Sequence, residues 1–240
     1  MSDTERLYRQ QSGTGVAFDE GLRQYMLGVY NYMAMGIAAT ALIGLFFIVN
    51  PSAIMAFSGP LMWLPFIGIL ALGWFAPRMI MNGSAAMAHG AYWLYVALWG
   101  LLIGPVVGIY AGIGLGAEFV KAFFITASVF AAMSLYGYTT KRDLAPMAKF
   151  FFMASVGLLI AILVNAFFVQ STLMSFITSG LVVLVFSGVT AWETQMIKNL
   201  YAKGAGDQNK RYAIYGAFSL YGTFVVLFIH ILNILGLARD

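Results

Sequence analysis

The sequence predicts an all-α integral membrane protein with seven transmembrane helices. Hydrophobic residues fill 61% of the 240 positions and charged residues only 9%, whereas soluble proteins carry about 25% charged residues. So few charges cannot cover a soluble surface, but in lipid the apolar side chains can face outward. Apolar runs of membrane-spanning length also recur along the whole chain. Together these features exclude a soluble domain.

Seven apolar runs meet or approach the roughly 20 residues that a helix needs to cross the hydrocarbon core. They are Met26–Val49, Leu61–Ala76, Met87–Tyr110, Phe119–Tyr138, Phe150–Val169, Leu173–Trp192 and Tyr212–Leu237. The second run is short and begins beside Pro60 and Pro65, so we expect it to extend back toward Ile54 with a kink. We divide the chain into an N-terminal tail over residues 1–24 and a seven-helix domain over residues 25–240.

Basic residues gather on one side of the predicted bundle. That side holds Arg6, Arg9, Arg23, Arg78, Lys141, Arg142, Lys149, Lys198, Lys203, Lys210 and Arg211. The other side holds Lys121 and Arg239. Because lysine and arginine are enriched in cytoplasmic loops, this asymmetry predicts a cytoplasmic N-terminus and an external C-terminus. It also accounts for the basic residues as topology signals, so no nucleic-acid partner is expected.

The third run contains a ladder of glycines that are four residues apart. Its members are Gly100, Gly104, Gly108, Gly112 and Gly116. This spacing stacks the glycines on one helical face, where a neighbouring backbone can approach closely. Pro105 removes one helical hydrogen bond beside them. The ladder therefore predicts either a packing face or a hinge.

The seventh run carries a polar stripe, which we define as Tyr212, Tyr215, Ser219, Thr223, His230 and Asn233, with Val226 filling the gap in the spacing. Polar groups in hydrocarbon need partners, so this face should point into the bundle or toward water. The seventh helix is therefore expected to be an interior helix. The stripe either bonds to neighbouring helices or lines a solvent path. His230 has no carboxylate or second histidine at ligand spacing, and we interpret it as a packing residue.

Glu193 ends the sixth run, and the chain from Glu193 to Arg211 is expected to be the longest loop. A carboxylate within a bilayer indicates a functional site, and the alternative is an interfacial residue paired with Lys198 or with another cation of the loop. Arg78 follows Pro77 at the end of the second run and is equally explained as a topology anchor. Hydrolase and metalloprotease motifs are absent from the sequence, as is cysteine, so no enzymatic activity is expected.

Four segments resemble the bacterial branch of the Bax inhibitor-1 family. The most specific is Ser134-Leu-Tyr-Gly-Tyr-Thr-Thr-Lys-Arg-Asp-Leu144. The others are Tyr30-Asn-Tyr-Met-Ala-Met-Gly36, Glu193-Thr-Gln-Met-Ile-Lys198 and Gly216-Ala-Phe-Ser-Leu-Tyr221. The resemblance covers about residues 25–237 and implies six helices around a central seventh, in a bacterial inner membrane.

The resemblance also implies a gate at the cytoplasmic side. In pH-sensitive calcium-leak members, two aspartates on the sixth and seventh helices share a proton and latch to an arginine on the second. Here Glu193 stands at the first aspartate position and Arg78 looks like the arginine. Thr223 occupies the second aspartate position, so the paired carboxylates are missing. Since calcium takes about six to eight oxygens, Glu193 is expected to be a weak calcium ligand at most.

Two functions follow from the resemblance. The first is a passive pathway for calcium or other cations, gated near Glu193 and Arg78. The second is a non-conducting regulator that binds other membrane proteins, because one bacterial branch of the family modulates an ATP-dependent membrane protease. The threonine at position 223 favours the second. No cofactor is expected, and the alternative is calcium bound in the pathway of the first hypothesis.

The predicted topology can be tested with reporter fusions. A reporter that is active only outside the cytoplasm should be active when it is fused after Asp240 and inactive when it is fused after Gly206. The physical reason is the concentration of basic residues on the side of the N-terminus. The opposite pattern of activity would show that the whole arrangement is inverted.

Overall fold

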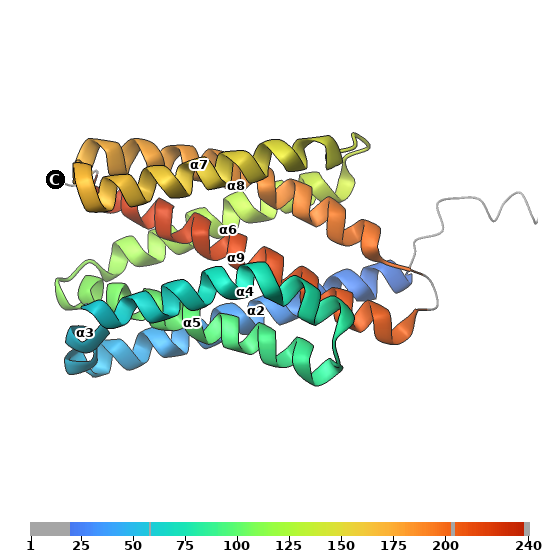
Figure 1. Cartoon of the computed structure of the whole chain (residues 1–240), viewed down its shortest axis with the longest axis horizontal. Coiled ribbons are helices and arrows are strands. Elements are labelled where there is room, and N and C mark those ends of the chain that lie inside the picture. The colour runs from blue at the N-terminus through green and yellow to red at the C-terminus, as the bar shows by residue number, and fades with distance from the viewer. Residues whose placement is uncertain (1–19, 58, 203–204, 238–240) are drawn as a thin grey trace, which may run out of the picture.

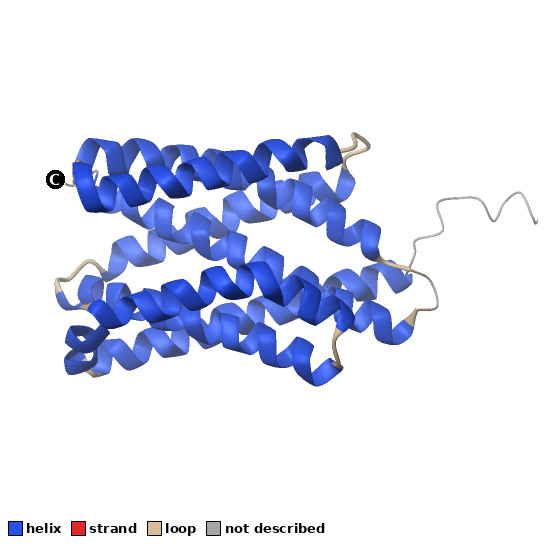
Figure 2. Ribbon diagram, in the orientation of Figure 1, coloured by secondary structure: helices blue, strands red, loops and turns tan. Residues whose placement is uncertain are grey.

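The computed structural model describes residues 20–57, 59–202 and 205–237, and these form a helical bundle without strands (Figures 1 and 2). Seven helices are long and apolar enough to cross a membrane, which confirms the predicted fold class. The helical elements are α2 (Glu20–Val49), α3 (Pro51–Phe57), η2 (Pro60–Met62), α4 (Trp63–Asn82), α5 (Ala85–Gly112), α6 (Gly116–Thr139), η3 (Ala145–Met147), α7 (Ala148–Val164), η4 (Asn165–Val169), α8 (Thr172–Leu200) and α9 (Gly206–Leu237).

Three predicted boundaries differ from the structure. The chain before the second span forms a separate short helix, α3, rather than a kinked extension of that span, because Pro51 and Pro60 each begin a new helical element. The expected loop from Glu193 to Arg211 is mostly helical, since α8 continues to Leu200 and α9 begins at Gly206. Helix α2 begins at Glu20, inside the predicted tail of residues 1–24. Residues 1–19 lie outside the described part of the chain.

Helix α9 is the centre of the bundle, as the sequence predicted. It packs against α2, α4, α5, α6 and α8. Residues such as Leu220, Tyr221 and Leu227 on α9 are completely buried. Helix α7 packs chiefly against α8 at the periphery, and Phe151 is the buried residue of its helix. The bundle is therefore organised around α9, with α7 as its most lipid-exposed helix.

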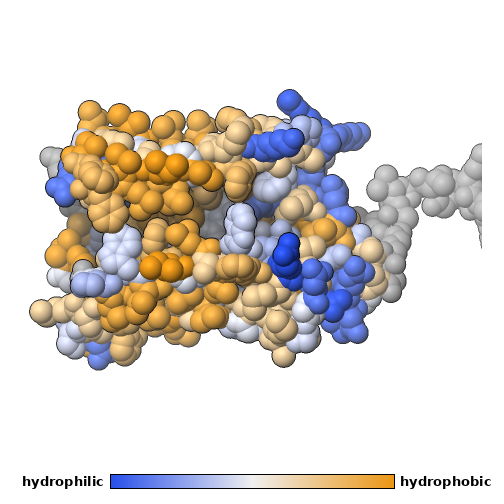
Figure 3. All heavy atoms as spheres, in the orientation of Figure 1, coloured by the Kyte–Doolittle hydropathy of each residue, from blue (hydrophilic) through white to orange (hydrophobic). Residues whose placement is uncertain are grey.

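The two ends of the bundle differ in polarity. In Figure 3 hydrophilic residues gather at the end where α2 begins, and hydrophobic residues cover the flanks. The described basic residues at that end include Arg23, Arg142, Lys198 and Lys210, whereas Lys121 lies near the start of α6, at the opposite end. We call the first the basic end. The charge segregation expected from the sequence is therefore present among the described residues, and the basic end is the one predicted to be cytoplasmic.

The glycine ladder packs against α2 and α3. A Cβ atom added at Gly100 would collide with the Ile43 side chain, and one added at Gly104 would collide with the ring of Phe47. At Gly108 it would meet Ile54. Gly112 is the last residue of α5 and Gly116 the first of α6, and neither has a neighbour within 4 Å of such an atom. Three of the five predicted glycines thus form a packing face.

We expect Gly104→Leu to destabilise the protein, because a leucine side chain has no room beside Phe47. Overpacking of this kind costs about 1–3 kcal/mol, measurable as a lower melting temperature in detergent. Gly90→Leu is the matched control, since Gly90 lies on the same helix and has open space around it. Equal melting temperatures for the two variants would show that the ladder does not limit helix packing.

Candidate functional site

Glu193 and Thr223 meet in the core between α8 and α9. The Thr223 hydroxyl donates a hydrogen bond to Oε2 of Glu193 at 2.8 Å. Both residues are buried, with exposed fractions of 9% for Glu193 and 5% for Thr223. The contact exists because α8 continues as a helix past Trp192, so that Glu193 is an interior residue and not the start of a loop. The alternative of an interfacial Glu193 paired with Lys198 is wrong, because Lys198 instead donates to the Tyr138 carbonyl oxygen.

Hydroxyl groups surround the Glu193 carboxylate. Ser219 and Tyr215, on the same stripe of α9 as Thr223, and Tyr95 of α5 are close enough to interact with it electrostatically. Among the described residues, no lysine or arginine forms an ion pair with Glu193. The site is therefore a single carboxylate in a shell of neutral donors.

Arg78 lies apart from this site. Its side chain is exposed on α4, and within the described ranges no hydrogen bond or ion pair joins it to Glu193. The structure thus brings together two of the three residues that the family resemblance placed at a gate. The third residue, Arg78, lies near the end of α4, one turn before Asn82.

The polar stripe of α9 faces α8 along much of its length. Toward the other end of the bundle, the Ser179 hydroxyl lies 3.0 Å from Nδ1 of His230 and donates to Oδ1 of Asn233 at 3.2 Å. With Thr223, three stripe residues therefore bond to α8. The prediction of an interior polar helix is confirmed, and interhelical bonding accounts for this part of the stripe. His230 bonds as a packing residue.

Two members of these contacts were missed from the sequence. Ser179 is almost fully buried, and it precedes Glu193 by four helical turns, so both lie on nearly the same face of α8. That spacing is a signal that could have been found. Tyr95 carried no such signal, because it lies among apolar residues of α5, and only the packing of α5 against α9 brings it to Glu193.

The segments that resemble the family contact one another at the basic end. The Leu144 amide donates to the Gln195 side chain at 2.8 Å, and Gln195 donates to the Arg142 carbonyl oxygen at 2.8 Å. The Ser134 and Thr194 hydroxyls lie 3.0 Å apart. Gly137 packs so closely on Ala191 that an added Cβ would overlap the Ala191 carbonyl group. These contacts fix α6 to α8 beside Glu193.

Comparison with known proteins agrees with this arrangement. Residues 22–240 match the family described as "Inhibitor of apoptosis-promoting Bax1". The chain belongs to the Bax inhibitor-1 family. It is 42% identical to a protein of Rickettsia prowazekii over 93% of each chain. It is 36% identical to the inner membrane protein YbhL of Escherichia coli, over 91% of this chain and 94% of YbhL. It is also 32% identical to a membrane protein of Streptococcus pyogenes, over 91% of this chain and 94% of that protein.

Family membership and the seven apolar helices make this chain a multi-pass inner-membrane protein of the bacterial type. The family resemblance that was based on four short segments is confirmed over nearly the whole sequence. The described residues contain no cluster of three or more histidine, aspartate or glutamate side chains that could hold a metal ion. Any cation at Glu193 would therefore be held by one carboxylate and by hydroxyl oxygens.

The hydrogen bond between Thr223 and Glu193 should contribute to stability. Thr223→Val keeps the shape of the side chain but leaves a buried carboxylate oxygen without its donor, which costs about 1.5–3 kcal/mol. We expect a correspondingly lower free energy of unfolding in detergent. Thr126→Val is the control, because Thr126 is equally buried and donates only to the Ala122 carbonyl oxygen of its own helix. Losses of equal size would argue against a special role for the interhelical bond.

Proposed function

We propose that the protein is a passive cation pathway whose ion-binding residue is Glu193. The observation that supports it is a buried carboxylate on α8, beside the central helix, without a basic partner among the described residues. Ionisable residues inside membrane bundles mark ion or proton pathways more often than they mark packing contacts. A carboxylate of this kind attracts a cation from solution, because no basic side chain in the described part of the chain pairs with it.

The pathway follows the seam between α8 and α9. From the basic end, Gln208 donates to the Tyr212 hydroxyl at 2.6 Å, and the stripe continues through Tyr215 and Ser219 to the Glu193–Thr223 pair. Val226 interrupts the polar side chains before His230. Val226 and His230 both line a cavity of about 480 Å³ between α4 and α7, with mostly apolar walls. The seam itself is closed at the Glu193–Thr223 pair, which is buried and hydrogen-bonded, and conduction requires α8 and α9 to separate there.

Weak binding is consistent with passage rather than storage. Tight calcium sites use several carboxylates, whereas Glu193 offers one. A conducting site must bind an ion strongly enough to admit it and weakly enough to release it. One carboxylate with hydroxyl oxygens from Thr223 and Ser219 fits that requirement for calcium or for another cation.

Flux through liposomes tests the proposal. Purified protein should pass calcium or a monovalent cation above the leak of empty vesicles, and Glu193→Gln should abolish that flux while the protein remains folded. Ser128→Ala, at an exposed position of α6 whose hydroxyl donates to the Phe124 carbonyl oxygen of the same helix, should leave the flux unchanged. Flux that is equal for the wild type and Glu193→Gln would remove Glu193 from any pathway.

A non-conducting regulator is the second candidate, and the position of α7 favours it. This helix packs chiefly on α8 and exposes the large apolar side chains Phe152, Met153, Val156 and Ile160. Such a surface can pack against the helices of another membrane protein, for example an ATP-dependent membrane protease. Liposomes without flux, together with capture of that protease by the wild type but not by an α7 surface variant such as Met153→Trp, would make this the better assignment.

A second carboxylate at position 223 should make the flux depend on pH. In Thr223→Asp two carboxylates would face each other, and such a pair shares a proton. As the pH rises and the shared proton is lost, the two like charges repel and should separate α8 from α9. We therefore expect cation flux to increase with pH in Thr223→Asp, and Glu193→Gln in the same chain should remove the dependence. A flat pH profile would falsify the shared site.

A further inference from the structure

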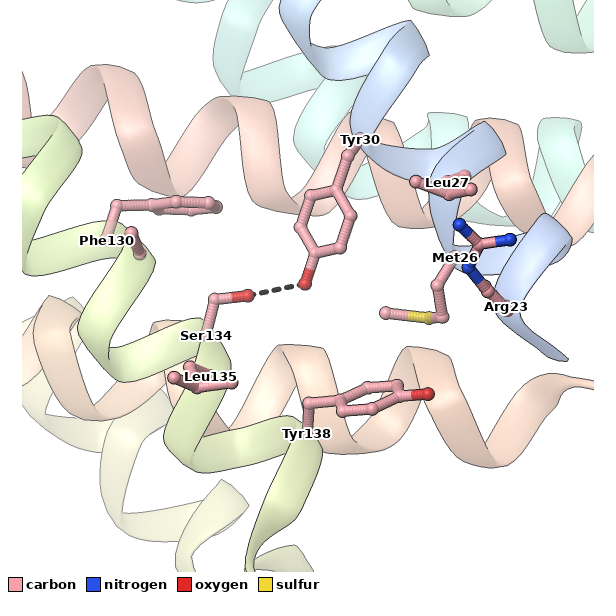
Figure 4. Close-up of a pocket in the computed structure, with 9 residues that line it drawn as sticks. Arg23, Met26, Leu27, Tyr30, Phe130, Ser134, Leu135 and Tyr138 are labelled. Carbon is pink, nitrogen blue, oxygen red and sulfur yellow. Dashed lines mark hydrogen bonds between the residues drawn. The ribbon is translucent and has the colours of Figure 1, made fainter. Parts of the chain in front are cut away.

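A cleft of about 520 Å³ lies between α2 and α6 near the basic end (Figure 4). Helix α2 packs on α5 and α9, whereas α6 packs on α8 and α9, so the two helices flank α9 and leave the cleft between them. Its apolar lining includes Met26 and Leu27 from α2 and Phe130 and Leu135 from α6. The cleft is open to the outside of the bundle along the membrane-spanning part of these helices.

The floor of the cleft is closed by a chain of hydroxyl groups. The Tyr30 hydroxyl lies 2.6 Å from the Ser134 hydroxyl, as drawn in Figure 4. Ser134 in turn lies 3.0 Å from Thr194. These groups satisfy one another, so the floor offers no strong attraction for water. The hydrocarbon of the bilayer is then the material that fills the apolar part of the cleft.

Among the described residues that line the cleft, the basic side chain is Arg23, and it lies at one end. Figure 4 places the Arg23 guanidinium and the Tyr138 hydroxyl at the same end, with Phe130 at the other. The Lys198 ammonium group adjoins this end, because it lies 4.9 Å from the centre of the Tyr138 ring and 2.7 Å from the Tyr138 carbonyl oxygen. One N–H group of Arg23 bonds to Glu20 at 3.2 Å, but a guanidinium carries five such donors. The cleft is therefore amphipathic, with a basic mouth and an apolar interior.

We propose that this cleft binds one anionic phospholipid from the leaflet at the basic end of the bundle. An acyl chain lies against Met26, Leu27, Phe130 and Leu135, and the phosphate group lies at the mouth, within reach of Arg23 and the Tyr138 hydroxyl. Basic pockets between membrane helices recognise anionic head groups by the same charge complementarity. Arginine suits this role because its planar fork of donors matches the geometry of a phosphate. The inference does not depend on whether the protein conducts ions.

The bound lipid would contact the elements that hold Glu193 in place. Tyr30 at the floor bonds to Ser134, and Ser134 bonds to Thr194, the residue that follows Glu193 on α8. A lipid that keeps α2 and α6 at a fixed separation therefore also fixes this chain of hydroxyls. The expected consequence is a protein whose stability depends on the lipid head group.

Lipid retention in detergent tests the proposal. Full-length protein is exchanged into detergent with equal amounts of phosphatidylglycerol and phosphatidylcholine, and retained lipid is counted by native mass spectrometry. The wild type should keep phosphatidylglycerol preferentially. Arg23→Gln should reduce that preference about fivefold, the factor that one basic side chain contributes at a membrane surface. Arg142→Gln, which removes an arginine of the same end outside the cleft lining, should leave the preference unchanged.

Filling the cleft is the second arm of the experiment. Ala131 lines the cleft, and Ala132 beside it is exposed but absent from the lining. Ala131→Trp should abolish retention of phosphatidylglycerol, whereas Ala132→Trp should retain it like the wild type. The melting temperatures of the two variants report whether both are folded. Equal retention of the two lipids by the wild type, or full retention by folded Ala131→Trp, would overturn the lipid site.

Discussion

The pairing of polar side chains between α8 and α9 is the constraint on which the rest of the structure depends. A hydrocarbon environment supplies no partners, so each polar group that enters it must find one inside the bundle. Thr223 and Asn233 both bond to α8, and this requirement holds α9 in the interior. The other helices can then be apolar on their outer faces, as the large exposed side chains of α7 are.

Hydropathy predicted the number of spans and the central position of α9, because both depend on which residues tolerate lipid. It could not predict where α8 ends. The polarity of Glu193-Thr-Gln suggested a loop, yet residues through Leu200 remain helical. Gln195 bonds to the Arg142 carbonyl oxygen after α6, and Lys198 bonds to the Tyr138 carbonyl oxygen of α6, so these polar side chains find partners. Family resemblance correctly placed Glu193 opposite Thr223. It placed Arg78 at the same site, but Arg78 lies apart from it, because its exposure depends on how α4 packs. The cleft between α2 and α6 could not be predicted, because it arises only from tertiary packing.

At the basic end, α6 and α8 are joined by several close contacts, whereas α9 has fewer polar bonds to α8. Gly137 brings the backbones of α6 and α8 together at Ala191. Two hydrogen bonds of Gln195 join the chain after α6 to α8, and Lys198 joins α8 to Tyr138 of α6 itself. At the same level α9 meets α8 through one carboxylate, because Glu193 accepts from Thr223 and interacts with Ser219. A movement that exposes Glu193 is therefore expected to separate α9 from α8, with α6 and α8 remaining together.

That movement has a consequence for α2. The Tyr25 hydroxyl donates to the Ile197 carbonyl oxygen at 3.1 Å, and Tyr30 reaches α6 through Ser134. At the same time the Thr40 and Tyr221 hydroxyls lie 2.5 Å apart, which ties the other half of α2 to α9. Helix α2 is thus bonded to both parts that would separate, with α6 and α8 at its basic end and with α9 farther along. Opening at Glu193 must either bend α2 between Tyr30 and Thr40 or break one set of these bonds, and the cleft beside Tyr30 would change width with it.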